Sequence, residues 1–158
     1  MPVVVGIDPG LSGGVCRLSS RVSFESIAVP MPVIGNQIDG RQLAALLVGA
    51  DLVAIEHAQA MPKQGVSSTF RYGQGFGTLI GVCEGLGLAY RLVKPRMWQT
   101  AVIGTGAGDT KQRSAEHVHR LYPWVDLLPG RMRKPHDGIA DAVCIAEWAK
   151  KSARGVGR

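Results

Sequence analysis

Cysteine and long apolar runs are scarce in this 158-residue sequence, and both shortages exclude classes of protein. The three cysteines, Cys16, Cys83 and Cys144, are far apart and form no CxxC pair. They therefore indicate no zinc site, and we expect buried thiols in a reducing compartment. No apolar run approaches the roughly 20 residues that a membrane-spanning helix needs. Because the chain opens on a strand-like segment, we expect no signal peptide either, and a cytoplasmic protein.

Nucleotide-binding signatures are also missing. The segment GTGAGDTK, residues 104–111, has the glycines of a phosphate loop but lacks the GK[ST] ending and follows no predicted strand. This excludes an ATP-binding P-loop. A small ATP-binding module of the actin type would need a second acid-and-glycine hairpin and an adenosine site, and the sequence contains neither. We therefore expect no nucleotide cofactor.

Basic residues outnumber acidic ones, which gives a formal net charge of +6. This balance makes nucleic acid a candidate partner. Hydrophobic residues make up 46% of the chain and charged residues 19%, as is usual for a soluble globular protein. The length and the lack of a linker predict one domain over residues 1–150, followed by a short basic tail over 151–158.

Apolar spacing predicts the element order βββαβαβα, with one additional short helix. The expected strands cover residues 3–7, 14–18, 21–28, 52–56 and 89–93. The expected helices cover residues 41–49, 70–88, 96–102, 110–121 and 136–150, and a loop is expected over 30–40. This order favours an α/β fold in which helices pack against a mixed sheet.

Four of the twelve acids occupy positions that predict a shared site. Asp8 ends the first strand, in VVVGIDPGLSGGV, and Glu56 ends the fourth. Asp137 and Asp141, in HDGIADAV, share one face of the last helix. Carboxylates that converge in this way repel each other unless a cation lies between them, and their hard oxygens suit Mg²⁺. Two such ions can activate water for phosphodiester hydrolysis.

Each acid also has a simpler interpretation. Asp8 could accept hydrogen bonds from amides of its own turn, Glu56 could face solvent, and Asp137 could cap the last helix. Asp141 is harder to dismiss, because it lies in an apolar stretch where an unpaired charge is costly. His136 is either a fifth participant in the site or a surface residue.

Three segments resemble motifs of the RuvC-like Holliday junction resolvases, which have the ribonuclease H-like fold. They are GIDPGLSGGV, VAIEHAQAMP and HDGIADAVCIA, and their order and spacing cover nearly the whole chain. The third segment is most similar to the phage-encoded branch of the family. The resemblance therefore implies a protein of bacterial or phage-infected cells. The resemblance implies a five-stranded mixed sheet in the order 3-2-1-4-5, with helices on both faces.

The resemblance also implies an activity. Asp8, Glu56, Asp137 and Asp141 would be the catalytic residues and would bind two Mg²⁺ ions per active site, with Mn²⁺ as a substitute. A homodimer would nick a four-way DNA junction at paired symmetric positions, in recombination and repair. Two alternatives stay open: a related nuclease that acts on RNA or on other branched DNA, and a DNA-binding protein without catalysis, which the four acids disfavour.

This chain departs from the better-known resolvases at two places. Asp137 and Asp141 stand four residues apart rather than three, which leaves the geometry of Asp137 open. Gln59 occupies the position of an aromatic residue that stacks on a junction base in those enzymes. Phe70 and Tyr72 are candidates to replace it, and no DNA sequence preference follows.

Basic residues along the chain are candidate phosphate contacts. Lys111 is the strongest of them, because it matches a lysine that the family has at the start of the corresponding helix. For each of the other candidates, a solvated surface charge is the simpler interpretation; they are Lys63, Arg71, Lys94, Arg96, Arg113, Arg131, Arg133 and Lys134.

Glycines have two expected tasks. Gly73, Gly77, Gly81 and Gly85 form a stripe along one helix, either for a dimer contact or for packing on the chain's own sheet or last helix. The glycines after Asp8 are expected to let the strand and a DNA backbone approach each other.

Overall fold

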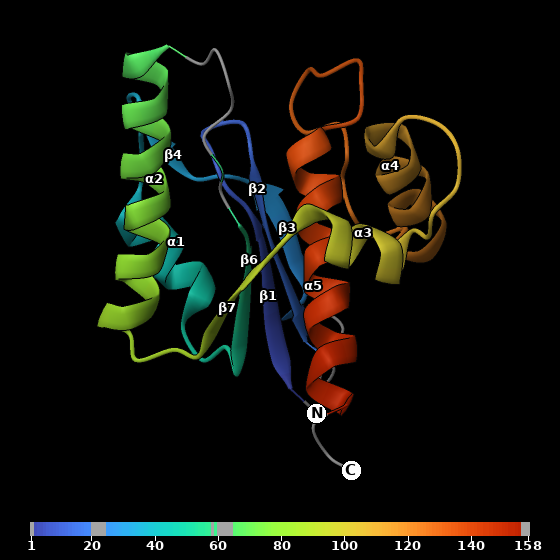
Figure 1. The fold of residues 1–158 in the computed structure, drawn as a ribbon, viewed down its shortest axis with the longest axis horizontal. Coiled ribbons are helices and arrows are strands. Elements are labelled where there is room, and N and C mark those ends of the chain that lie inside the picture. The colour runs from blue at the N-terminus through green and yellow to red at the C-terminus, as the bar shows by residue number, and fades with distance from the viewer. Residues whose placement is uncertain (1, 20–24, 58, 60–64, 156–158) are drawn as a thin grey trace.

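A five-stranded sheet forms the centre of the computed structural model, which describes residues 2–19, 25–57, 59 and 65–155 (Figure 1). Its strands are β1 (Val3–Asp8), β2 (Gly14–Ser19), β3 (Ile27–Pro30), β6 (Leu52–Glu56) and β7 (Tyr90–Val93). They lie in the order β3-β2-β1-β6-β7, with β1 antiparallel to β2 and parallel to β6. This confirms the expected order, because β6 and β7 are the fourth and fifth predicted strands.

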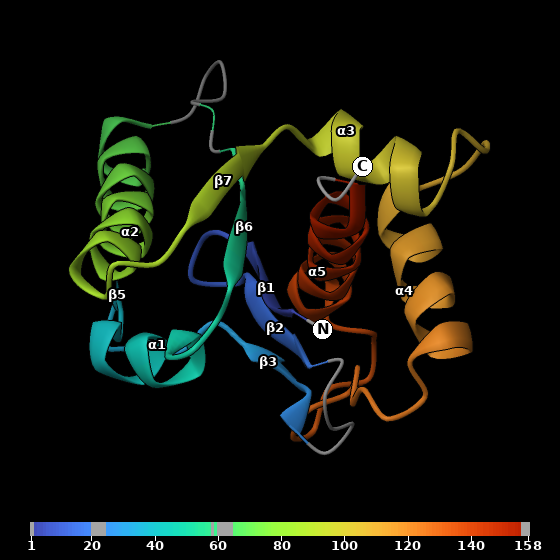
Figure 2. The same cartoon turned by 90° about the horizontal axis from the view of Figure 1, so that it is seen from below.

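Helices cover both faces of the sheet (Figure 2). One face carries α1 (Gly40–Leu47) and α2 (Val66–Gly85), and the other carries α3 (Pro95–Val102), α4 (Thr110–Leu121) and α5 (Asp137–Gly155). Successive side chains of β1 point to opposite faces of the sheet and so contribute to both hydrophobic cores. Val4 packs in the core that contains α5, and Val5 and Ile7 pack in the core that contains α1 and α2. Within the described ranges, no helix has the length and apolarity that crossing a membrane requires.

The segment 30–40 is not only the loop that its composition predicts. It contains a two-stranded hairpin of β4 (Val33–Ile34) and β5 (Gln37–Ile38). Gly35, at φ +58°, begins the two-residue turn between them. Gly-Asn is a favoured pair for such a turn, but strands of two residues are too short to show a periodicity.

Several element boundaries also differ from expectation, and the largest differences are at the third strand, α2 and α5. The third strand covers Ile27–Pro30 rather than residues 21–28, of which 21–24 lie outside the described residues. Helix α2 begins at Val66 rather than at residue 70, and α5 continues to Gly155. The first part of the expected basic tail is therefore helical.

Helix α5 touches the β1–β2 hairpin backbone to backbone. A Cβ atom added to Gly6 would run into the backbone of Ala142 and Ala146, and one added to Gly14 would run into Gly138. A Cβ atom on Gly138 would in turn meet the backbone of Gly13. Gly14 therefore serves the approach of α5, whereas Gly13 lets the turn close on the carbonyl of Asp8. An approach of DNA at these glycines stays a prediction.

The glycine stripe of α2 lies on an open surface. A Cβ atom added to Gly73, Gly77, Gly81 or Gly85 meets nothing within 4 Å. The alternative that this stripe packs against the chain's own sheet or last helix is therefore wrong.

Glu147 joins α4 to α5 inside the protein. It is 8% exposed, and its Oε2 lies 2.7 Å from Nε2 of His117 and accepts a hydrogen bond from the Tyr122 hydroxyl at 3.0 Å. Lys151 Nζ lies 2.8 Å from its Oε1. Because a buried carboxylate is costly unless it is paired, this cluster fixes α4, and with it Lys111, relative to α5.

Gly6→Ala should reduce the free energy of unfolding by about 3 kcal/mol or more, because backbone atoms that cannot rotate away occupy the space for the methyl group. Gly40→Ala in α1 is the matched control, because its Cβ would lie 3.7 Å from its nearest neighbours, and we expect it to stabilise the protein by up to about 1 kcal/mol. Urea unfolding measures both. A Gly6→Ala protein as stable as the wild type would contradict the backbone contact between β1 and α5.

Candidate active site

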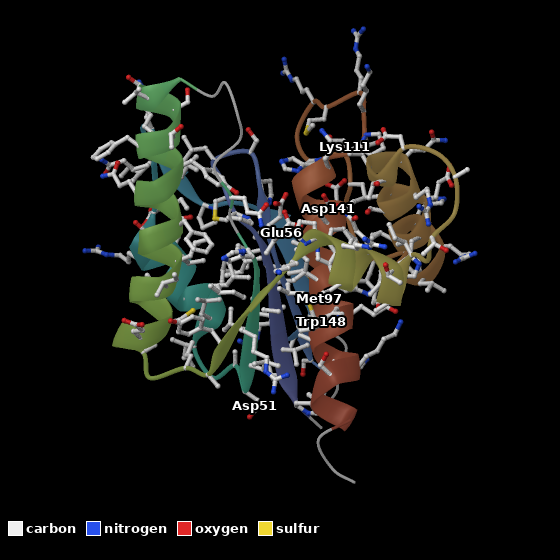
Figure 3. The ribbon with its side chains drawn as sticks, in the orientation of Figure 1. Asp51, Glu56, Met97, Lys111, Asp141 and Trp148 are labelled. Atoms are coloured by element: carbon white, nitrogen blue, oxygen red, sulfur yellow. The ribbon has the colours of Figure 1, made fainter. Side chains whose placement is uncertain are left out.

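Asp8 and Glu56 end two neighbouring parallel strands. Ile7 of β1 lies opposite Ile55 of β6, so the carboxylates that follow them stand at the same edge of the sheet. Asp141 lies one turn into α5, which packs along β1 and β2. Figure 3 shows Glu56, Asp141 and Lys111 gathered at this end of the sheet. The structure therefore brings three of the four predicted acids toward one place from three separate elements.

The buried carboxylates disfavour each other's charge. Burial, followed by the negative charges of Asp141 and Glu56, raises the pKa of Asp8 from 3.8 to about 8. Burial is also the main cause that raises the pKa of Asp141 to about 6. Closing of the turn does not depend on Asp8, because the N–H of Gly13 donates to the carbonyl of Gly10 at 3.1 Å. Raised carboxyl pKa values of this kind are typical of functional sites.

Glu56 does not simply face solvent, because the indole N–H of Trp98 donates a 2.7 Å hydrogen bond to its Oε2. Trp98 is completely buried in α3. Burial raises the pKa of Glu56, and this hydrogen bond opposes the rise by stabilising the charged form. No local sequence pattern indicates Trp98, because the contact spans 42 positions of the chain.

Asp137, in the first turn of α5, lies at the outer side of the four predicted carboxylates. Its Oδ2 forms an ion pair with Lys111 Nζ at 3.0 Å, and its side chain is 48% exposed. Asp137 is not the helix cap, because the N–H of Ile139 donates to Nδ1 of His136 at 3.2 Å. His136 therefore has a capping task that sequence reasoning missed; a further role at the site stays a prediction.

The donor set suits a hard cation. All four predicted ligands are carboxylates, and Oδ1 of Asp141 is buried without a hydrogen-bond partner among the described residues. As they stand, no three His, Cys, Asp or Glu side chains in the described ranges are close enough to hold a metal ion. The carboxylates are thus close enough to shift each other's pKa values but too far apart to hold one ion together. A cation would have to draw them closer.

The predicted DNA contacts lie in different settings. Tyr72 approaches the turn after Asp8, where its ring lies 3.4 Å from a Cβ atom added to Gly10. Arg71 lines a hollow with Tyr72 and Gly10, and Phe70 is 73% exposed.

Two other predicted contacts have different outcomes. The guanidinium of Arg113 donates to the carbonyls of residues 103, 104 and 106 and so holds the turn before α4. Lys63 lies outside the described residues. Gln59, at the position of the family's stacking aromatic residue, is exposed.

Comparisons with known proteins agree with this arrangement. The crossover junction endodeoxyribonuclease RuvC of Marinobacter nauticus is 30% identical, with 92% of this chain and 84% of that protein covered. No protein-family model matches the chain.

Solved structures share the fold. Thermus thermophilus RuvC in complex with a Holliday junction substrate gives a TM-score of 0.72 at 19% identity, with 99% of this chain and 97% of that chain covered. The T. thermophilus RuvC structure gives 0.64 at 21% identity, over 98% and 96%. The yeast mitochondrial Holliday junction resolvase Ydc2 gives 0.56 at 15% identity, over 96% and 79%.

Stability without divalent cations should fall as the pH rises from about 4 to about 8. Between the unfolded pKa of 3.8 and the folded pKa of about 8, folded Asp8 holds a proton that the unfolded chain releases. Asp8→Asn should flatten this slope and raise the free energy of unfolding at pH 8, whereas exposed Asp126→Asn should not. Urea unfolding in a chelator at several pH values measures this, and equal slopes for wild type and Asp8→Asn would refute it.

Trp98→Phe should raise the pKa of Glu56 further, because the indole donor that stabilises its charged form is lost. Carboxyl ¹³C NMR titration measures this pKa directly. Trp148→Phe, at a partly buried tryptophan of the same core, is the control for loss of ring volume and should leave Glu56 unchanged. An unshifted Glu56 in Trp98→Phe would contradict the positioning of Glu56 by the indole.

Proposed function

Since the chain belongs to the RuvC family of crossover junction endodeoxyribonucleases, we propose that it cuts four-way DNA junctions by paired symmetric nicks that depend on Mg²⁺. The observation that carries the proposal is the convergence of Asp8, Glu56 and Asp141 from β1, β6 and α5 at one edge of the sheet. A binding protein without catalysis would gain nothing from buried carboxylates of raised pKa beside DNA phosphates.

The four acids would hold two Mg²⁺ ions, or Mn²⁺ in their place. The chemistry that such ions supply is activation of water and neutralisation of the charge that develops on the leaving oxygen. Asp8 and Asp141 would release their protons when the cations bind, because both carboxyl groups have raised pKa values. The hydrogen bond from Trp98 would hold one oxygen of Glu56 in place. Lys111 would leave its ion pair with Asp137 and contact a DNA phosphate instead.

A homodimer would supply the two active sites that paired nicks require. The outer face of α2 supports this part of the proposal, because four glycines leave it flat and open. Val66 and Phe70, on the same helix, are 87% and 73% exposed. Two copies of α2 can approach each other closely at such a face, around a two-fold axis.

Purified protein should nick synthetic four-way junctions symmetrically in Mg²⁺, and should leave plain duplex and RNA–DNA hybrid intact. Asp8→Asn should lower the cleavage rate by a factor of about 10³ or more while junction binding persists. Asp51→Asn, at the opposite end of the sheet from Glu56 (Figure 3), should keep full activity, because an amide oxygen can still accept the hydrogen bond from the N–H of Val3. Denaturing gels measure cleavage, and fluorescence anisotropy measures binding.

The other outcomes of this assay assign other functions. Equal cutting of hybrid or duplex would indicate another nuclease of this fold, acting on RNA or on other branched DNA. Binding without cleavage in both Mg²⁺ and Mn²⁺ would leave the acids without the proposed task.

Gly77→Arg should convert a wild-type dimer into a monomer, because it places a long charged side chain in the middle of the open face of α2. Thr100→Arg, at an exposed position of α3, is the charge-matched control and should remain dimeric. Light scattering coupled to size exclusion measures the mass. A Gly77→Arg dimer would exclude this face as the interface.

A further inference from the structure

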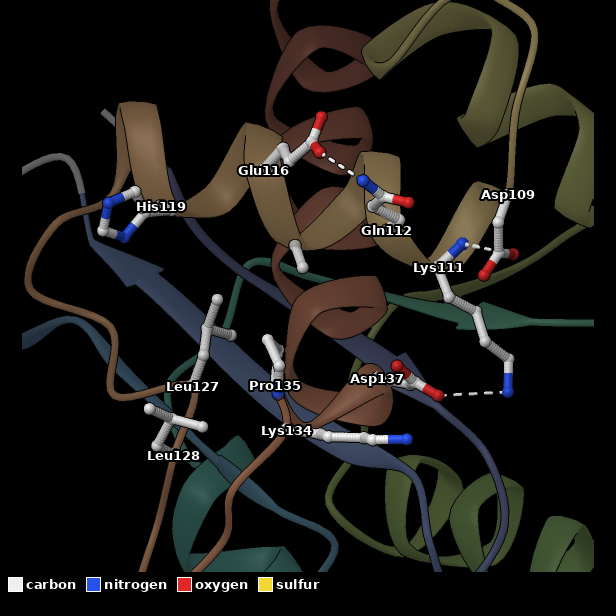
Figure 4. A pocket seen from close by; sticks show the side chains of 11 residues that line it. Asp109, Lys111, Gln112, Glu116, His119, Leu127, Leu128, Lys134, Pro135 and Asp137 are labelled. Atoms are coloured by element: carbon white, nitrogen blue, oxygen red, sulfur yellow. Dashed lines mark hydrogen bonds and ion pairs between the residues drawn. The ribbon is translucent and has the colours of Figure 1, made fainter.

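A cavity of about 530 Å³ opens beside the candidate active site (Figure 4). It lies between α4 and the opposite segment, residues 127–135, which leads into α5. Its walls are largely apolar and include Ala115 of α4 together with Leu127, Leu128 and Pro135 of the opposite segment. Among the described residues, no phenylalanine, tyrosine or tryptophan lines it. The hollow is separate from the edge of the sheet where Asp8 and Glu56 stand.

Two residues line the cavity and also belong to the candidate active site. Lys111 and Asp137 line the cavity, and their 3.0 Å ion pair lies at one end of it, as Figure 4 shows. Lys134 lines the same end from the opposite segment. A DNA strand whose phosphate lies at the acids would therefore pass this opening, and the neighbouring nucleotide is the first group that could enter.

We propose that this cavity receives a nucleobase that leaves the stack next to the phosphate that is cut. The inference rests on the proposed function, because it needs junction DNA at the acids. The volume exceeds that of a single base, and apolar walls with a few polar groups are typical of pockets for small planar ligands. The hydrogen-bonded side chains of Gln112 and Glu116 and the ring of His119 could meet polar edges of the base.

The charges around the cavity favour a base over a phosphate inside it. Carboxylates of Asp109, Glu116 and Asp137 line it along with the ammonium groups of Lys111 and Lys134. The two signs nearly balance, so an anion gains little by entering, whereas the lysines at the opening can hold the sugar–phosphate backbone outside. A neutral heterocycle is therefore the better match for the interior.

A base pocket at this place would also contribute to the choice of substrate. Taking a base out of a continuous duplex costs a few kcal/mol, and the cost is lowest where pairing or stacking is already interrupted. Bases at the branch point of a junction are in that condition when its arms are unstacked. The pocket would therefore favour branched DNA over plain duplex without reading a base sequence.

Junctions that carry 2-aminopurine test the inference, with the probe moved through the positions on either side of the cleaved phosphate. The fluorescence of 2-aminopurine rises when it leaves the base stack, and the described lining residues include no phenylalanine, tyrosine or tryptophan on which it could stack again. Asp8→Asn protein keeps the DNA uncut during the measurement. We expect a severalfold rise in fluorescence at one probe position. This rise should be lost in Leu128→Gln, which removes an apolar wall, and in Ala115→Leu, which fills the cavity.

Leu121→Gln is the matched control, because Leu121 is as exposed as Leu128 but does not line the cavity. It should keep the wild-type signal, and anisotropy should give junction binding for every variant. A bound junction with no bright position, or with the same rise in Leu128→Gln and Ala115→Leu, would overturn the pocket and leave the proposed function intact. Absence of junction binding by all proteins would overturn both.

Discussion

The backbone of α5 lies directly on the backbone of the β1–β2 hairpin, and the geometry of the acids depends on this contact. Gly6, Gly14 and Gly138 leave no side chain between the two elements. Any Cβ atom there would push the helix away from the sheet, and with it Asp141. Gly14, which follows the turn after Asp8, therefore serves to bring a helix to the carboxylate, and the same approach keeps Asp141 largely buried.

Burial then determines the chemistry of the acids. Asp8 and Asp141 are taken out of water near each other, so each has a raised pKa and loses its proton less readily than an exposed aspartate. Cations bound there as proposed would offset the cost of burying these charges. Asp137 differs because it is half exposed and paired with Lys111, which makes it the acid most easily rearranged when a phosphate arrives.

The helical layer of α3, α4 and α5 holds the groups around the acids in place. Trp98 of α3 fixes one oxygen of Glu56, and the buried cluster around Glu147 fixes α4 against α5. Because α4 carries both Lys111 and one wall of the proposed base pocket, that cluster aligns the pocket with the acids. The opposite layer leaves the outer face of α2 open, so the two layers have separate proposed tasks, one at the substrate and one at a second subunit.

The sequence by itself determined the fold class, the sheet order through its family resemblance, and the positions of Asp8, Glu56 and Asp141. Strand ends and one helix face are local properties, which alternation and i,i+4 spacing record directly. Only the tertiary structure decided that Trp98 holds Glu56, that His136 caps α5, that the α2 stripe is open and that a cavity lies beside Asp137. These features arise where distant segments pack together or leave a face uncovered, and no local pattern encodes that.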